Sequence, residues 1–320
     1  MKHLALISIF LFLSVCTLCA EKLTIAFGSC NKRKLEQPVW SILSKHIKPD
    51  LWVWIGDIIY GDTKNMDLLA RKYREQYERA DYQDFRNNYK IIGIWDDHDY
   101  GANNSGKEHS KKKEAQQLLL DFLDEPKDSP RRKQEGVYAV YDQIVGSTRV
   151  KIILLDTRYH RDPYGKHSDV LGKAQKAWLN EILSKSKTDI HLIVSSIQVI
   201  SSEHQWEKWE NFPQAKKELF EILRTHKTPN VIFLSGERQI GDISCWKNSP
   251  LGYPVWDITS SGLTHSWGER FHGEPNKYRV GNYYPGLNFG LVEIQSKTRE
   301  IKLELRNMRN QSINSVHLHY

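Results

Sequence analysis

Residues 94–101 read IWDDHDYG and place three aspartates around one histidine, directly after an apolar run. Carboxylates at this spacing repel one another unless a cation, a set of hydrogen-bond donors or protonation relieves the repulsion. Asp97, His98 and Asp99 offer a metal ligand, a proton-transfer group and a carboxylate that can fix the tautomer of the imidazole. A local ion pair or a turn is the alternative interpretation of a histidine beside acids.

A second candidate acid is Asp57, in the stretch WIGDIIYGD. A lone aspartate after a glycine is most often the cap of the following turn or helix. Here Tyr60 follows three residues later and Asp62 five residues later. A loop that leaves a strand at this point could direct Asp57 and Tyr60 into one pocket.

The elements that must position these residues are predicted by hydrophobic periodicity. Short apolar runs rich in β-branched residues predict strands at residues 23–27, 51–55, 91–95, 150–155, 191–195, 231–234, 255–259, 289–294 and 301–305. Apolar residues that return every three or four positions predict helices at residues 38–46, 68–80, 114–122, 171–183 and 215–224. Strands that alternate with helices predict a layered α/β fold with helices on the outer faces of the sheets, and the last runs predict some antiparallel pairing.

Four of the predicted strands end in polar residues. These ends are Gly28-Ser29-Cys30, Gly56-Asp57, residues 96–99 and residues 235–239. In α/β sheets, ligands bind at the carboxyl ends of the strands. We therefore expect these side chains to meet in one site.

The first twenty residues differ from the rest of the chain. Lys2 and His3 precede an apolar run, and small or neutral residues follow up to Ala20, which is typical of a cleavable secretory signal peptide. The run is too short to predict a transmembrane anchor. We expect residues 1–20 to be a signal peptide, residues 21–320 to form a single domain, and the protein to be secreted or lumenal in the secretory pathway.

Cleavage after Ala20 would leave Cys30 and Cys245 as the only thiols, in a compartment that favours oxidation. They could form one disulfide, or Cys30 could be a metal ligand and Cys245 a bystander. The formal net charge of +7 in 320 residues predicts a mildly basic, solvated surface. No specific nucleic-acid-binding module is recognisable in the sequence, and the sequence does not predict an oligomeric state.

Eight ordered motifs together closely resemble the PhoD-like alkaline phosphatases and phosphodiesterases, which belong to the calcineurin-like metallophosphoesterase superfamily. The motifs are Gly28-Ser29-Cys30, GDIIYGD, IWDDHDYGANN, LLDTR at residues 154–158, LG..Q..WL at 171–179, SSIQ at 195–198, FLSGERQIGDIS at 233–244 and SSGLTHS at 260–266. The resemblance extends over nearly the whole mature chain. It implies a four-layer α-β-β-α sandwich with two or more metal ions at the strand ends.

The resemblance also implies roles for individual residues. The implied metal ligands are Cys30, Asp57, Tyr60, Asp97, Glu237 and Gln239, for divalent or trivalent ions that could be Ca, Fe, Mn or Zn. His98 would be the general acid, steadied by Asp99, and Arg158 and Asn104 would be candidate phosphate-binding or supporting groups. The implied reaction is the attack of a metal-bound hydroxide on a phosphomonoester or phosphodiester, with His98 protonating the leaving alkoxide.

One motif departs from the family pattern. The family usually reads S-G-D-x-H where this chain has Glu237 in place of the aspartate and Gln239 in place of the histidine. A longer acid and a neutral amide oxygen suit Ca²⁺ better than a transition metal. The alternative to an active enzyme is therefore a catalytically impaired member that binds metal or a phosphate-bearing ligand.

Overall fold

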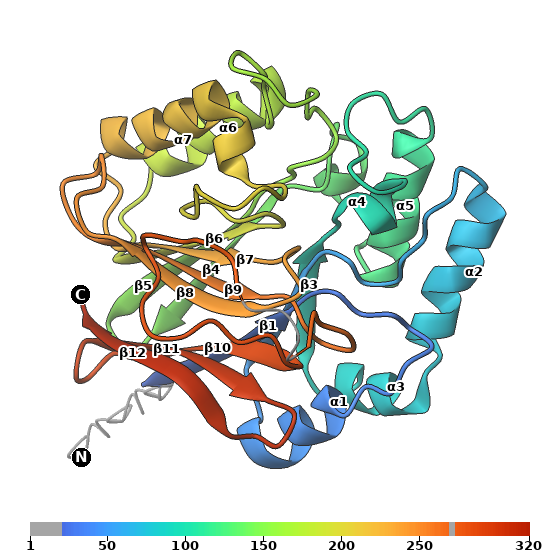
Figure 1. Cartoon of the computed structure of the whole chain (residues 1–320), viewed down its shortest axis with the longest axis horizontal. Coiled ribbons are helices and arrows are strands. Elements are labelled where there is room, and N and C mark those ends of the chain that lie inside the picture. The colour runs from blue at the N-terminus through green and yellow to red at the C-terminus, as the bar shows by residue number, and fades with distance from the viewer. Residues whose placement is uncertain (1–20, 269–272) are drawn as a thin grey trace, which may run out of the picture.

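The computed structural model describes residues 21–268 and 273–320, and the predicted signal segment lies outside them. Two six-stranded sheets lie face to face (Figure 1). The strand order is β12-β11-β10-β1-β2-β3 in the first sheet and β4-β5-β6-β7-β9-β8 in the second. The strands of the first sheet are β1 (Lys22–Gly28), β2 (Leu51–Ile55), β3 (Lys90–Ile94), β10 (Asn288–Gln295), β11 (Glu300–Asn307) and β12 (Ser312–His319). Those of the second are β4 (Ala139–Val145), β5 (Thr148–Leu154), β6 (Ile190–Ser195), β7 (Val231–Ser235), β8 (Gly241–Trp246) and β9 (Val255–Ser260).

Each sheet combines a parallel centre with antiparallel edges. In the first sheet β1, β2 and β3 are parallel, and β10 pairs antiparallel with β1. In the second sheet β5, β6, β7 and β9 are parallel, and β4 and β8 pair antiparallel at the two edges. The parallel strands bring their carboxyl ends to one edge of each sheet, which is where the polar motifs follow.

Helices cover the outer faces of the two sheets. The helical elements are α1 (Val39–Ile42), η1 (Leu43–Ile47), α2 (Met66–Tyr77), α3 (Ala80–Arg86), α4 (Asp97–Tyr100), α5 (Lys112–Phe122), η2 (Pro130–Arg132), α6 (Gly172–Ser184), η3 (Trp209–Asn211) and α7 (Pro213–Thr225). Figure 1 shows α6 and α7 over the second sheet and α1 to α3 on the opposite side of the molecule, next to the first sheet. The predicted four-layer α-β-β-α architecture is therefore confirmed. None of the helices in the described ranges has the length and hydropathy that a membrane span requires.

The core explains why the central strands read as continuous apolar runs. All five residues of β2, LWVWI, are buried, because one face of the strand packs on the helices and the other on the second sheet. Trp40 of α1 contacts Trp52 and Trp54 of β2 edge to face, with ring centroids 5.1 and 5.4 Å apart. Burying aromatic side chains of this size contributes strongly to stability.

All nine predicted strands and all five predicted helical segments are present, with shifted ends. The prediction omitted β4, β8, β12, α3 and α4. Strand β12 lies at a sheet edge and alternates exposed and half-buried residues, so it has no continuous apolar run. Helix α4 is a single turn made of the polar residues Asp97, His98 and Asp99 with Tyr100.

Candidate metal centre at the strand ends

Side chains from four strand ends meet between the two sheets. Cys30 follows β1, Asp57 follows β2, Asp97 follows β3 and Glu237 follows β7. Sγ of Cys30 lies 3.4 Å from Oδ2 of Asp57 and 3.6 Å from the carbonyl oxygen of Glu237. The hydroxyl of Tyr60 donates a hydrogen bond of 3.0 Å to the same Asp57 oxygen. The expected convergence of these loops is therefore observed.

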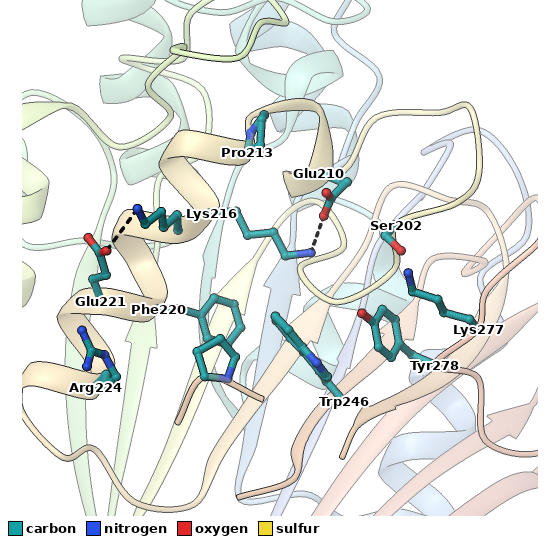
Figure 2. Close-up of a pocket in the computed structure, with 12 residues that line it drawn as sticks. Ser202, Glu210, Pro213, Lys216, Phe220, Glu221, Arg224, Trp246, Lys277 and Tyr278 are labelled. Atoms are coloured by element: carbon teal, nitrogen blue, oxygen red, sulfur yellow. Dashed lines mark hydrogen bonds and ion pairs between the residues drawn. The ribbon is translucent and has the colours of Figure 1, made fainter. Parts of the chain in front are cut away.

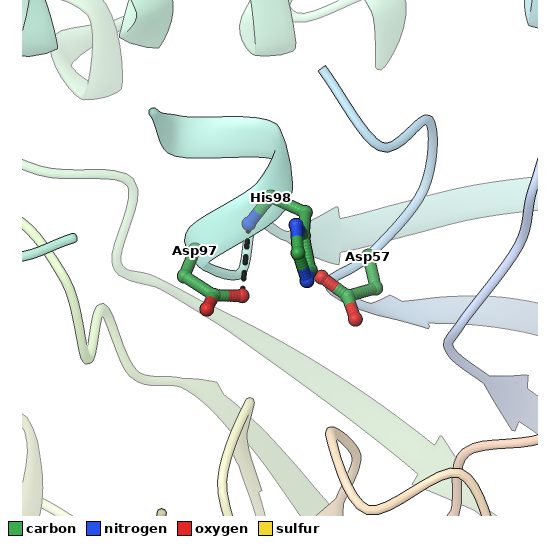
Figure 3. A group of neighbouring side chains, drawn as sticks. All are labelled: Asp57, Asp97 and His98. Carbon is green, nitrogen blue, oxygen red and sulfur yellow. Dashed lines mark hydrogen bonds between the residues drawn. The ribbon is translucent and has the colours of Figure 1, made fainter. Parts of the chain in front are cut away.

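The acids form two overlapping groups with the spacing of metal ligands. Asp57, Asp96, Asp97 and Glu237 each place one carboxylate oxygen within 4.8 Å of the others. In the second group, a ring nitrogen of His98 lies within the same distance of carboxylate oxygens of Asp57 and Asp97 (Figure 3). Asp57 Oδ1 and Asp96 Oδ2 are buried and accept no hydrogen bond from the described residues. Buried carboxylate oxygens without donors are costly unless a cation neutralises them. The donor set therefore fits a metal centre.

Electrostatics support the same conclusion. Burial raises the pKa of Asp57 well above its ordinary value, and the charge of Asp97 raises it further. Burial also raises the pKa of Glu237, with Asp97 and Asp57 adding to the effect. The pKa of Asp96 is raised by burial although the positive charge of Arg158 opposes this. A bound cation would favour the ionised form of these acids, as opposite charge does.

The backbone at the site adopts a conformation that is uncommon for residues other than glycine. Thirteen such residues in the described chain have a positive φ, and seven of them belong to the site and its surroundings: Cys30, Asp57, Tyr60, Asp62, Asn104, Glu237 and Gln239. Left-handed conformations of this kind cost energy and cluster at functional sites. Their concentration here marks this edge of the sandwich as functional.

Two glycines allow the strand ends to approach one another. A Cβ atom added to Gly56, which has φ +82°, would lie 2.4 Å from Cβ of Asp96. A Cβ atom added to Gly236 would lie 2.6 Å from Oγ of Ser29 and 2.9 Å from the carbonyl oxygen of Ile55. Larger side chains at these positions would push the ligand-bearing loops apart.

His98 is oriented by Asp62, and the prediction that Asp99 steadies it is wrong. Nδ1 of His98 lies 2.6 Å from Oδ1 of Asp62, and the imidazole stacks on the Tyr60 ring at 4.4 Å between centroids. The Asp99 carboxylate instead accepts backbone hydrogen bonds from Ile58 and Ile59, at 2.8 to 2.9 Å. Asp99 therefore holds the loop that carries Asp57 and Tyr60.

Arg158 does not line the cavity, so of its two predicted roles the buried contacts favour the supporting one over phosphate binding or catalysis. Its side chain is fully buried, and Nε lies 2.6 Å from Oδ1 of Asp96. Its second partner is Glu207, 2.8 Å away. Both acids lie beneath the site, so Arg158 orients Asp96 from the protein interior and neutralises charge there.

The remaining predicted residues lie at the edges of the site. The backbone N–H of Asn104 donates a 2.6 Å hydrogen bond to Oδ2 of Asp97, while the Asn104 side chain accepts one from Tyr164. Asn104 thus contacts Asp97 through its backbone, and its exposed side chain remains a candidate substrate contact. Gln239 lines the mouth of the site, and its carbonyl oxygen accepts a hydrogen bond from the backbone of Trp267.

Both thiols of the described chain are free. Cys30 therefore remains available as a ligand, although burial and the nearby charges of Asp57 and Glu237 raise its pKa well above the ordinary value. A thiol with a raised pKa can still bind metal as the thiolate, because the cation displaces the proton, which is released to solvent. Cys245 lies in β8, and its pKa is raised by burial.

A cavity of about 560 Å³ adjoins the site at Tyr60 and His98 and is lined by these two residues, Asp62, Gln239 and residues 32–35. A second cleft, of about 480 Å³, lies between α7 and the end of β8 (Figure 2). Its floor contains Phe220, Trp246 and Tyr278. No carboxylate of the metal centre lines this second cleft.

Three residues of the site had no role assigned from the sequence. Asp96 joins the carboxylate cluster, Asp62 pairs with His98, and Glu207 pairs with Arg158. The first two lie inside the motifs IWDDHDYG and GDIIYGD, so the composition of those motifs could have indicated them. Glu207 lies in a loop with no local pattern that predicts burial.

Comparisons with known proteins agree with this geometry. The sequence pattern of a family described as PhoD-like phosphatase matches residues 25–241. Among proteins with curated descriptions, none matches the sequence.

Three solved structures illustrate the likeness of the fold. PhoD is 16% identical with a TM-score of 0.73, over 93% of this chain and 68% of its own. The purple acid phosphatase PPD1 from yellow lupin (Lupinus luteus) is 14% identical with a TM-score of 0.64, over 94% of this chain and 54% of its own. GAP50, the anchor in the inner membrane complex of Plasmodium, is 13% identical with a TM-score of 0.65, over 94% of this chain and 89% of its own.

Proposed function

The chain belongs to the PhoD-like phosphatase family of phosphoric ester hydrolases, and from this premise we propose that it is a secreted, metal-dependent phosphoesterase in which His98 donates the proton to the leaving group. The substrate is a phosphomonoester or a phosphodiester. The single observation that carries the proposal is the cluster of Asp57, Asp96, Asp97 and Glu237 with its unpartnered, buried oxygens.

The residues that would hold the metal are Asp57, Asp97 and Glu237, with Cys30 and Tyr60 beside Asp57. When bound, such a cation supplies a Lewis acid for the phosphoryl oxygens and lowers the pKa of a coordinated water. Asp96 is the fourth acid of the cluster, and its ion pair with the buried Arg158 fixes the position of its carboxylate.

His98 is placed to deliver a proton. Burial alone would lower its pKa, but the hydrogen bond to Asp62 and the charge of Asp97 outweigh burial and raise the pKa to about 9. With Nδ1 donating to Asp62, the imidazolium can present its Nε2 proton to a leaving oxygen in the cavity that His98 lines. The proton therefore moves from Nε2 to the departing alkoxide.

The second candidate function is metal or phosphate binding without turnover. It is favoured by Gln239, which offers a neutral oxygen where the family usually has a histidine. The carboxylate of Glu237 nevertheless reaches the cluster despite its extra methylene. This retained acid supports metal binding in either case, so turnover is the property that separates the two functions.

The test is hydrolysis of p-nitrophenyl phosphate and bis-p-nitrophenyl phosphate by the mature protein loaded in turn with Ca²⁺, Mn²⁺, Fe and Zn²⁺, with elemental analysis of each sample. The proposal requires turnover that Asp57→Asn abolishes and Cys245→Ala leaves intact. Stoichiometric metal without turnover would establish the binding function instead. Secretion is tested separately, by N-terminal sequencing of the exported protein, which should begin at Glu21.

A further inference from the structure

The cavity that His98 lines is also lined by a strongly basic segment. Lys32, Arg33 and Lys34 line the cavity in succession, and Leu35 completes the segment with an exposed apolar side chain. They follow directly from Cys30 and Asn31 at the end of β1. One short segment thus carries a buried candidate metal ligand, Cys30, and three positive charges that line the neighbouring cavity.

This segment is a turn fixed to the metal centre. The backbone N–H of Leu35 donates to the carbonyl oxygen of Lys32 at 2.8 Å, which closes the turn. The N–H of Lys32 donates to Oγ1 of Thr264 at 2.7 Å, and Arg79 donates to the carbonyl oxygen of Arg33 at 3.0 Å. Asn31 donates to the carbonyl oxygen of Asp57 at 2.7 Å. The distance between the basic turn and Asp57 is therefore set by backbone hydrogen bonds.

Two of the three positive charges are available to a ligand. Arg33 is occupied by Glu75, 2.5 Å away, and by the carbonyl oxygen of Ile59. Lys32 and Lys34 are exposed and form no ion pair with a carboxylate of residues 21–268 or 273–320. Nζ of Lys32 lies 5.5 Å from the centre of the Tyr60 ring, on whose face His98 stacks.

We propose that Lys32 and Lys34 form a subsite for a second anionic group of the substrate, a phosphate or a carboxylate that is not itself cleaved. The inference rests on the proposed function, because it takes the ester to be bound at the metal centre. A substrate with one phosphate at the metal centre and a second anion across the cavity would contact both walls. The substrate class is therefore a phosphate ester with an additional anionic group.

The subsite would bind an anion because the backbone of Lys32 and Lys34 is already fixed before the anion arrives. A cation bound by the acids of the centre would neutralise the reacting phosphate, which leaves the charges of the lysines for a second anion. Their side chains reach outward from a fixed backbone, and a second anion would lose less entropy on binding there than on a mobile loop. Exposed cations act on such a group with modest strength, and salt weakens the interaction.

The second cleft supplies a matched control. Lys217 and Arg224 line it and are exposed, although Lys217 lies 3.7 Å from a carboxylate oxygen of Glu221, and neither lines the cavity next to the metal centre. The double variants Lys32→Ala/Lys34→Ala and Lys217→Ala/Arg224→Ala remove the same net charge. A difference between them therefore reports position and not the general field of the protein.

The experiment compares AMP with adenosine 3′,5′-bisphosphate, which adds one phosphate to the same nucleoside. For the bisphosphate, the Lys32→Ala/Lys34→Ala variant should raise KM about 10-fold with kcat unchanged, as expected for two exposed charge contacts. KM for AMP should stay within about 2-fold, and the second-cleft variant should resemble the wild type with both substrates. Equal effects on AMP and the bisphosphate, or no effect on either, overturn the subsite.

A binding measurement separates this inference from the proposed function. Calorimetric titration of the metal-loaded His98→Asn protein with both nucleotides should show a preference for the bisphosphate that the Lys32→Ala/Lys34→Ala change removes. If no metal supports turnover of the nucleotides or of the two p-nitrophenyl esters but this preference is present, the phosphoesterase proposal fails and the subsite holds. If turnover is present and the preference is absent, the subsite alone fails.

Discussion

Nδ1 of His98 lies 2.6 Å from a carboxylate oxygen of Asp62, which reaches it from the loop that also carries Asp57 and Tyr60. The proposed proton donor, His98, and the candidate metal ligands Asp57 and Tyr60 therefore depend on the same loop. A displacement of this loop would affect metal binding and proton transfer together.

The first prediction concerns the pH dependence of turnover in Asp62→Asn. Proton donation requires the protonated imidazole, so activity is present below the pKa of His98 and is lost as the pH rises through it. Asp62 raises this pKa, so its neutralisation should move the alkaline limb of the kcat/KM profile to lower pH by about one unit.

The control for this variant is Asp67→Asn, in the first turn of α2, which removes the same charge from an exposed residue outside the cavity. Its alkaline limb should stay where it is in the wild type. An Asp62→Asn profile that overlays the wild-type profile would show that His98 does not donate the proton.

The second prediction concerns Asp99→Asn. Oδ1 of Asp99 accepts from the N–H groups of Ile58 and Ile59, and Oδ2 accepts from the N–H of Asp96 at 3.3 Å. An amide NH₂ in place of either oxygen therefore leaves at least one buried donor without its acceptor. We expect the free energy of unfolding to fall by about 1–3 kcal/mol. We also expect weaker metal binding, because the loop that carries Asp57 is no longer held.

Urea unfolding of the metal-free protein and metal titration measure the two effects. Asp142→Asn is the control, because its carboxylate on edge strand β4 is exposed and pairs with Lys151. A stable Asp99→Asn protein with normal metal affinity and a shifted alkaline limb would restore the role that the sequence predicted for Asp99.

The contrast between Asp57 and Asp99 shows which parts of the site can be predicted from the sequence alone. Asp57 was predicted because a buried strand ends next to it, and this is a local signal. The contacts of Asp99 and Arg158 could not be predicted in this way, because their partners are decided by long-range packing. The Asp99 carboxylate binds amides that lie about forty residues earlier in the chain, and Arg158 pairs with Asp96 and Glu207 from separate loops.

The same limit applies to the elements. The buried central strands can be predicted from their unbroken apolar runs, as in β2. In edge strand β4, Asp142 and Ile144 are exposed and polar and apolar side chains are mixed, so the sequence has no unbroken apolar run. Strand β4 forms because it pairs with β5, and this pairing cannot be read from the local sequence. Chain-wide motifs compensated for this limit, because they predicted the four-layer fold without each edge strand being identified.

The third prediction concerns stability and His191 in β6. Its Nδ1 donates to the carbonyl oxygen of Pro229 at 2.9 Å, and burial lowers its pKa from 6.5 to about 4. Between these pH values the unfolded chain binds a proton that the folded protein does not, so stability rises with pH. Lowering the pH from 6.5 to 4 should therefore cost up to about 3 kcal/mol through this residue.

Urea unfolding at a series of pH values measures this slope. In His191→Gln the dependence between pH 4 and 6.5 should flatten, although the variant is less stable at neutral pH. His319→Gln, near the end of edge strand β12, is the control and should keep the wild-type slope. An unchanged slope in His191→Gln would assign the acid sensitivity to other groups.

The fourth prediction concerns the departure from the family pattern at Glu237 and Gln239. Both residues have a positive φ, and the backbone of Gln239 is held by the hydrogen bond from Trp267, so exchanging the side chains leaves the loop path in place. Glu237→Asp with Gln239→His would restore an imidazole nitrogen, which transition metals prefer over an amide oxygen. We expect the double variant to retain more Mn, Fe or Zn relative to Ca, and to hydrolyse p-nitrophenyl esters faster with those metals.

Gln311→His, which adds an imidazole in the turn before β12, controls for surface binding. Unchanged metal content and rate in the double variant would mean that this loop does not contact the ion, and the ligand set would then reduce to the acids of the first sheet.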